Sequence, residues 1–171
     1  YHLITSKEDR NDLLALLLKQ KSVCFDTETD SLNASHANIV WVSFSFKSGE
    51  AFYVATTNDF NEAKSILEEF RPFFESDSIE KIAHNIKYDI KVINRYGVEV
   101  VGPIFDTMIA HYLINPDSKQ SMDFLAEFYL NYQPVSIESL IGKKGKNQKS
   151  MADLTPQEVS NYACEDADIT F

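Results

Sequence analysis

The stretch Ser22-Val23-Cys24-Phe25-Asp26-Thr27-Glu28-Thr29-Asp30 (residues 22–30) decides the fold expected for this chain. Its first half is apolar and predicts a buried strand, which ends in two carboxylates, Asp26 and Glu28. Residues two apart in a strand point to the same face, so these two acids face one side and Thr27 faces the other.

Adjacent carboxylates at the end of an apolar strand repel each other and are costly to desolvate. A bound divalent cation such as Mg²⁺, which prefers oxygen ligands, offsets both costs. The pattern Asp-x-Glu is short, so the alternative that a polar loop begins one residue early stays open at this point.

The composition describes a globular domain. The chain has 171 residues, of which 44% are hydrophobic, and this is enough for one domain with a core of its own. We therefore expect a single domain over residues 1–171. The chain begins at Tyr1 rather than Met, and Phe171 stops inside a helical pattern, so we expect a piece of a longer protein.

Charge, hydropathy and cysteines limit the classes of partner. The formal net charge of −10 argues against a surface that holds nucleic acid by bulk positive charge. No apolar run is long enough to cross a bilayer, and the N-terminus lacks the regions of a signal peptide, so we expect no membrane partner. Cys24 and Cys164 give no disulfide framework, which favours a reducing, cytoplasmic location.

The order of predicted elements favours an α/β domain with three layers and a mixed sheet flanked by helices. We expect strands at 23–26, 39–46, 51–55, 81–83 and 98–104, with a tight turn joining the second and third. We expect helices at 6–20, 61–74 (interrupted near Pro72), 86–96, 106–114, 122–130 and from 155 onward. Residues 141–151 form the longest predicted loop and hold the local basic cluster Lys143, Lys144, Lys146 and Lys149.

The last predicted helix carries three acids, Glu165, Asp166 and Asp168. At 100° per residue, Asp166 falls within a mostly apolar face, one turn after Tyr162. A buried Asp needs a ligand or a hydrogen-bond donor, and a simple hydrogen-bond acceptor role is the alternative to metal binding. Glu165 falls on the flank and Asp168 on the opposite side, where we expect solvent.

A fourth acid, Asp89, lies at the margin of the core stripe of the 86–96 helix and can reach the edge of a cleft. Asn85, just before this helix, is a candidate for a substrate contact or simply for a helix cap. Four convergent carboxylates make a poor acid–base pair but a good cage for two hard cations, which can stabilise both oxygens at a reacting phosphorus. Tyr162 is placed to orient the attacking water.

Five ordered blocks carry a resemblance that covers nearly the whole chain. They are residues 25–32 (FDTETDSL), 85–89 (NIKYD), 105–108 (FDTM), 145–148 (GKNQ) and 162–168 (YACEDAD). Together they resemble the DnaQ-like 3′–5′ exonucleases with four acids and a tyrosine (DEDDy), and are similar to the proofreading domains of bacterial DNA polymerase I. The resemblance implies a ribonuclease H-like fold with a five-stranded mixed sheet.

The resemblance also implies roles for the acids. Asp26 would bridge two divalent cations, with Mg²⁺ expected and Mn²⁺ or Zn²⁺ as alternatives. Glu28 and Asp166 would complete one site, and Asp89 would hold the second cation through water. Tyr162 would align the attacking water and also touch the substrate.

The substrate contacts are likewise implied by the resemblance. Leu32 would wedge against the terminal base, and Thr27, Asn85 and Tyr88 would contact the terminal nucleotide. Two positions depart from the family pattern: Met151 stands where an aromatic residue often stacks on a base, and His84 stands where a Gln often precedes the Asn. The grip on the base is therefore expected to differ, while the acids are complete.

Three functions follow as hypotheses. The first is a metal-dependent 3′–5′ exonuclease that removes mispaired nucleotides from the single-stranded 3′ end of DNA as 5′-monophosphates, acting as a monomeric unit beside the polymerase domain of the same chain. The second is an RNA-trimming exonuclease of the ribonuclease D kind, which shares the acids. The third is a non-catalytic structural domain of a polymerase, which the intact acids disfavour.

Overall fold

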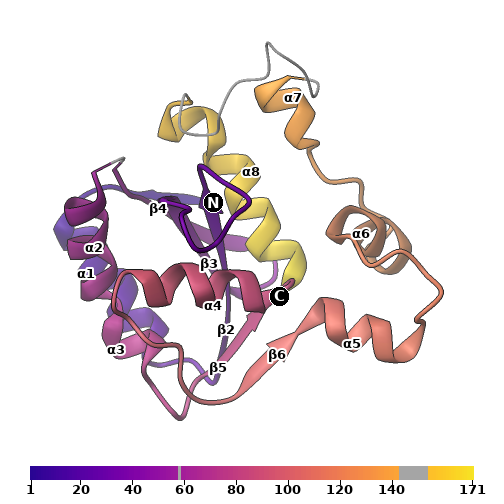
Figure 1. Cartoon of the computed structure of the whole chain (residues 1–171), viewed down its shortest axis with the longest axis horizontal. Helices are drawn as coiled ribbons and strands as arrows, with labels where there is room; N and C mark the ends of the chain where they lie inside the picture. Colours follow the sequence, from indigo (N-terminus) through magenta and orange to yellow (C-terminus); the bar gives the residue numbers. More distant parts are fainter. Residues whose placement is uncertain (58, 143–153) are drawn as a thin grey trace.

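The computed structural model describes residues 1–57, 59–142 and 154–171. Within these ranges the chain forms a mixed six-stranded sheet in the order β1-β4-β3-β2-β5-β6 (Figure 1). The strands are β1 (His2–Ile4), β2 (Ser22–Thr29), β3 (Ile39–Lys47), β4 (Glu50–Ala55), β5 (Glu80–Ala83) and β6 (Ile104–Asp106). Strand β3 pairs antiparallel with β2 and β4, whereas β1–β4, β2–β5 and β5–β6 are parallel.

Strand β2 lies between β3 and β5, and its side chains alternate between the two faces of the sheet. Phe25 belongs to the larger core, which is covered by α1 (Lys7–Leu17), α2 (Phe60–Glu69), α3 (Arg71–Phe74) and α4 (Ile86–Arg95). The opposite face of the sheet is covered by α8 (Pro156–Thr170), whose Val159 and Ala163 pack on Trp41. The expected three-layer α/β arrangement is therefore confirmed.

Polar side chains fix where several helices begin. Ser6 accepts a hydrogen bond from the Asp9 amide at 3.0 Å and opens α1. Asp59 accepts bonds from the first turn of α2, and Asp106 does the same for α5 (Thr107–Ile114). Gly97, with φ +82°, follows the end of α4 and takes the left-handed conformation that a C-terminal cap requires.

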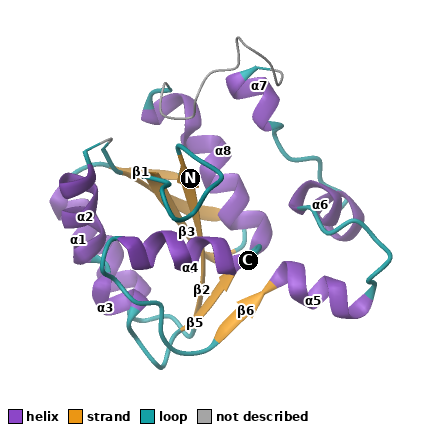
Figure 2. Ribbon diagram, in the orientation of Figure 1, coloured by secondary structure: helices purple, strands orange, loops and turns teal. Residues whose placement is uncertain are grey.

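Helices α5, α6 (Met122–Leu130) and α7 (Ile137–Ile141) lie beside the sheet rather than on it, as Figure 2 shows. A cavity of about 230 Å³ separates α5, α6 and the end of α8. Large apolar side chains of α5 and α6 face solvent, with Leu113 77% and Ile114 75% exposed. These two helices therefore present an apolar surface that the rest of the described chain does not cover.

The sheet differs from the sequence prediction at both edges. It has six strands rather than five, because the three-residue β1 pairs in parallel with β4. The strand predicted at 98–104 is wrong in its extent. The ladder with β5 begins only at Ile104, which pairs with Lys81, and Pro103 contributes a carbonyl to the Lys81 amide at 2.9 Å.

The helices also differ from the sequence prediction in two places. The helix predicted at 61–74 is two helices that meet at Phe70, with Pro72 in the first turn of α3, where its missing N–H is not needed. The short helix α7 was not predicted. Most of the predicted loop 141–151, with its four lysines, lies outside the described residues. None of the helices in the described ranges is both long and apolar enough to cross a bilayer.

Candidate active site

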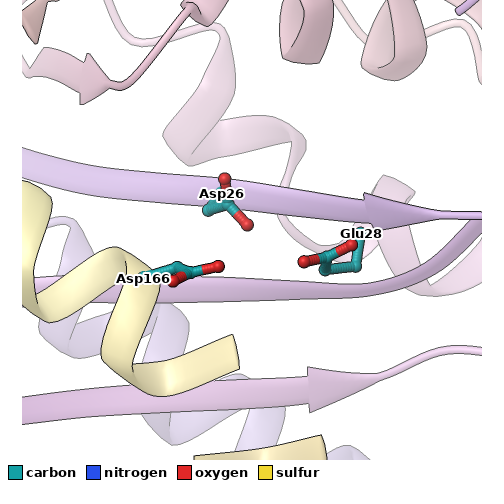
Figure 3. A group of neighbouring side chains, drawn as sticks. All are labelled: Asp26, Glu28 and Asp166. Carbon is teal, nitrogen blue, oxygen red and sulfur yellow. The ribbon is translucent and has the colours of Figure 1, made fainter. Parts of the chain in front are cut away.

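Three carboxylates from two distant parts of the chain meet on the α8 side of the sheet. Asp26 and Glu28 point from β2 toward α8, and Asp166 points back from α8 (Figure 3). One carboxylate oxygen from each residue lies within 4.8 Å of the other two. The prediction that Asp166 points into the protein is confirmed, since its side chain is buried.

Burial and mutual repulsion disfavour the charged forms of these acids. Burial raises the pKa of Asp26 to about 6. Burial also raises the pKa of Glu28 well above its usual value, and the charges of Asp26 and Asp166 raise it further. The pKa of Asp166 is raised by burial and then by Asp26. Near neutral pH the group therefore needs a compensating positive charge.

Asp89 reaches the same strand from the other layer. It is buried on α4, and its Oδ1 accepts hydrogen bonds from the Thr27 amide at 3.1 Å and the Thr27 hydroxyl at 2.5 Å. Strand β5 pairs with β2 only as far as Cys24. Beyond that residue, the Asp89 carboxylate accepts a hydrogen bond from the β2 backbone at Thr27. Burial raises the pKa of Asp89 and the charge of Asp26 adds to this, but Asp89 is not one of the three carboxylates that meet within 4.8 Å.

Tyr162 lies half-buried on α8, one turn before Asp166. Burial, followed by the charges of Asp166 and Glu28, raises the pKa of its hydroxyl, so it keeps its proton. The hydrogen bond between Tyr162 and Asp166 lowers the pKa of the carboxyl, which partly opposes the effect of burial. Asp166 thus interacts with a side chain of its own helix and is also a member of the acidic group.

The residues assigned to the substrate lie in different settings. Leu32 is 98% exposed, whereas Thr27 is buried against Asp89. Asn85 occupies the N-cap position of α4 with φ 66°, but its side chain makes no capping bond, so the cap alternative does not account for its side chain. The Tyr88 hydroxyl forms hydrogen bonds with the Thr29 hydroxyl at the end of β2 and with the Ser31 carbonyl in the loop that follows.

Two further residues, His84 and Met151, were also expected to contact the substrate. The His84 ring is half-buried and its Nδ1 lies 2.9 Å from the Thr107 hydroxyl, which orients the ring toward α5. Met151 lies outside the described residues.

One acid of α8 was placed wrongly from the sequence. Glu165, expected in solvent, is buried and accepts hydrogen bonds from the Tyr132 hydroxyl and, at 2.7 Å, from the Val135 amide. Asp168, also expected in solvent, is half-buried, and it accepts exposed hydrogen bonds from the Tyr1 hydroxyl at 2.9 Å and the Gly49 amide at 2.7 Å. A helical projection considers one helix alone, whereas these hydrogen-bond donors belong to segments that pack beside α8.

Asp106 is a further buried acid that the sequence reading did not single out. Its Oδ1 accepts from the amides of Asn85, Met108 and Ile109 at 3.2, 2.9 and 3.2 Å. It thereby ties the start of α4 to the start of α5. Its place just before a run of helix-forming apolar residues was the available signal, since Asp is a favoured N-cap.

The donor set of the acidic group suits a hard divalent cation. All of the carboxylates offer oxygen ligands, which Mg²⁺ and Mn²⁺ prefer. No ion pair found among the described residues involves any of the four acids. Their charge is therefore left for a cation to balance, and the residues fit the metal that the chemistry implies.

Comparison with known proteins identifies the family. The model of a family described as 3′–5′ exonuclease matches residues 1–171. DNA polymerase I of Borreliella burgdorferi is 38% identical over 174 residues, which cover 100% of this chain and 19% of that protein. The chain thus spans about a fifth of the length of the curated relatives that it matches.

Solved structures share the fold at lower identity. Escherichia coli RNase D, an exoribonuclease involved in structured RNA processing, has a TM-score of 0.71 at 18% identity, with 99% of this chain and 42% of that chain covered. Brucella melitensis NrnC with bound Mg²⁺ has a TM-score of 0.69 at 20% identity, covering 99% and 74%. The fold is ribonuclease H-like, and the chain belongs to the family of 3′–5′ exonuclease domains found in DNA polymerase I.

Proposed function

We propose that this domain hydrolyses phosphodiester bonds at the single-stranded or frayed 3′ end of DNA, releasing 5′-monophosphates with the help of two divalent cations. The observation that carries the proposal is the convergence of Asp26, Glu28 and Asp166 within 4.8 Å, from a strand and a helix far apart in sequence. Mg²⁺ is the proposed metal, and Mn²⁺ is the proposed substitute for tests.

The proposed roles follow the positions of the side chains. When bound, the cations would neutralise charge at the phosphorus and lower the pKa of the attacking water. Asp26 would contact both cations, Glu28 and Asp166 would complete the first site, and Asp89 would support the second through water. Tyr162 keeps its proton, so its hydroxyl can hold the attacking water in line.

A surface hollow beside α4 suits a single-stranded substrate. Leu32, Asn85 and Tyr88 line one surface hollow, so an unpaired nucleotide would meet an exposed apolar side chain next to polar groups. The net charge of −10 makes tight binding by charge alone unfavourable. We propose that few nucleotides are held and that they are selected by being unpaired.

The proposed setting is a DNA polymerase I in the cytoplasm, in which the polymerase part of the same chain supplies the frayed end and the protein acts as a monomer. Two observations support a partner within the same chain. The chain matches only 19% of the Borreliella burgdorferi protein. In addition, the apolar side chains of α5 and α6 that face solvent are of the kind that domain contacts bury.

Digestion of an end-labelled single-stranded DNA, resolved on a gel, tests the proposal. We expect stepwise shortening from the 3′ end with Mg²⁺ or Mn²⁺ and none with a chelator. Asp26→Ala should reduce the rate by several orders of magnitude while the circular dichroism spectrum is kept. Near wild-type turnover of that variant would contradict the assigned role of Asp26.

RNA trimming is the second candidate, because RNase D shares the fold. At 18% identity that likeness concerns the fold alone, so the substrate is decided by digestion of matched DNA and RNA strands. A purely structural role is the third candidate. Absence of cleavage of both strands with both metals would favour it.

A further inference from the structure

The loop between β2 and β3 holds Leu32 in solvent. Asp30 and Asn38 close its base: the Asp30 amide donates to the Asn38 carbonyl at 3.1 Å, and the Asn38 amide and side-chain nitrogen donate to the Asp30 carboxylate at 2.8 and 2.9 Å. Leu32, near the start of the loop, is 98% exposed. These hydrogen bonds hold the two ends of the loop together, but they do not by themselves fix the direction of its first residues.

A second set of bonds fixes that start. The Tyr88 hydroxyl of α4 donates to the Ser31 carbonyl at 2.5 Å. The Thr29 hydroxyl, at the end of β2, lies 2.9 Å from the same carbonyl and 2.5 Å from the Tyr88 hydroxyl. Three groups from a strand, a helix and the loop therefore meet at the carbonyl of the residue just before Leu32.

This arrangement uses the Tyr88 hydroxyl within the protein. A tyrosine hydroxyl has one hydrogen, and Ser31 accepts it, so the donor is not free for a nucleotide. The Tyr88 ring and Leu32 line the same hollow, of about 310 Å³, together with Asn85.

We propose that Tyr88 is a positioning residue: it holds the Ser31 carbonyl, with Thr29 as its partner, and so sets where Leu32 stands beside the nucleotide to be removed. The proposal deepens the proposed function and rests on it for the role of Leu32. It replaces a direct contact between the Tyr88 hydroxyl and the substrate by an action through the loop.

A double-mutant cycle separates the two roles. We would measure kcat/KM on a single-stranded DNA for Tyr88→Phe, Thr29→Val and Leu32→Ala, and for Tyr88→Phe combined with Leu32→Ala. Each single change should lower kcat/KM by about tenfold, mainly through KM, and the combined variant should be no worse than Leu32→Ala alone. Tyr112→Phe, which removes an exposed hydroxyl from α5, is the matched control and should leave the rate unchanged.

The opposite pattern would overturn the proposal. If the hydroxyl contacts the substrate directly, the losses from Tyr88→Phe and Leu32→Ala multiply, and Thr29→Val has little effect. If Tyr88→Phe fails to fold, the same cycle can be measured with Thr29→Val and Leu32→Ala, because the Thr29 hydroxyl lies against the same Ser31 carbonyl.

Hydrogen exchange gives a readout that does not depend on cleavage. The amides of residues 31–37 should exchange several-fold faster in Tyr88→Phe and in Thr29→Val than in the wild type, while those of α1 stay unchanged. Unchanged exchange in the loop would contradict the positioning role of Tyr88, even in an active enzyme. Faster exchange in a protein that cleaves nothing would support the positioning role and would contradict the proposed function instead.

Discussion

Thr27 donates two hydrogen bonds to a single oxygen of Asp89, from its amide at 3.1 Å and from its hydroxyl at 2.5 Å. Thr27 lies on β2 between two acids that point to the other face of the sheet, so these bonds join the two layers at the level of the site. They leave the second Asp89 oxygen to a water or a cation. The position of the Asp89 carboxylate therefore depends on Thr27 as well as on helix α4.

The first prediction concerns Thr27→Val, which keeps the shape of the side chain and the amide bond but removes the hydroxyl bond to Asp89. We expect kcat to fall by about tenfold, because Asp89 loses a charge-assisted hydrogen bond that orients it. Steady-state kinetics on single-stranded DNA measures this. Thr5→Val, at an exposed position away from the site, is the control, and equal rates for both variants would contradict the role given to Thr27.

The second prediction concerns pH and the metal-free protein. The folded-state pKa of Asp26 is about 6, above its usual value of 3.8, so the folded protein binds more protons than the unfolded chain between these values. Stability is therefore lost as pH rises through this window. We expect the free energy of unfolding without metal to fall between about pH 4 and pH 6, and Asp26→Asn to reduce that slope and to raise Tm near neutral pH.

Added Mn²⁺ completes this test, because an ion that binds only the folded state raises Tm by mass action. Near neutral pH the ion should raise Tm of the wild type by several degrees and that of Asp26→Asn by much less. Equal shifts in the two proteins would mean that the ion binds elsewhere.

The third prediction concerns Glu165, which secures the segment after α6 to α8. Glu165→Ala leaves the Val135 amide and the Tyr132 hydroxyl without this acceptor. We expect it to lower the free energy of unfolding by about 2 kcal/mol in urea denaturation. Glu127→Ala, at an exposed position of α6, should change stability by less than about 0.5 kcal/mol. A Glu165 variant as stable as this control would show that the bonds contribute nothing measurable.

Local patterns were enough to predict the three clustered acids. The period of two along β2 placed Asp26 and Glu28 together, and the projection of α8 placed Asp166 on its inner face, because both rules depend on one element at a time. The burial of Glu165 could not be predicted in this way. Its partner Tyr132 lies 33 residues away in the sequence, so only tertiary packing decides its burial.

The same limit explains the errors in the sheet. Strand β1 has three residues and becomes a strand only by pairing with Phe52 to Val54 of β4. Residues 98–103 have strand-like composition, but the partner that would make them a ladder, β5, is four residues long and meets the chain at Ile104. Composition predicts a tendency to extend, whereas a ladder needs a neighbour.

The fourth prediction concerns Tyr162→Phe, which removes the hydroxyl proposed to hold the attacking water and keeps the ring. We expect kcat to fall by roughly 10²-fold with little change in KM, since the contact is made in the transition state. Single-turnover digestion would separate chemistry from binding. An unchanged kcat would remove the tyrosine from the mechanism, and a change confined to KM would make it a binding residue.

The central claim is that Asp26, Glu28, Asp89 and Asp166 bind divalent cations together, and a calorimetric titration with Mn²⁺ tests it most directly. We expect the wild-type domain to bind two ions, and Asp166→Asn to lose at least one of them while keeping its circular dichroism spectrum. No binding to the wild type, or equal stoichiometry and affinity in the variant, would contradict the claim.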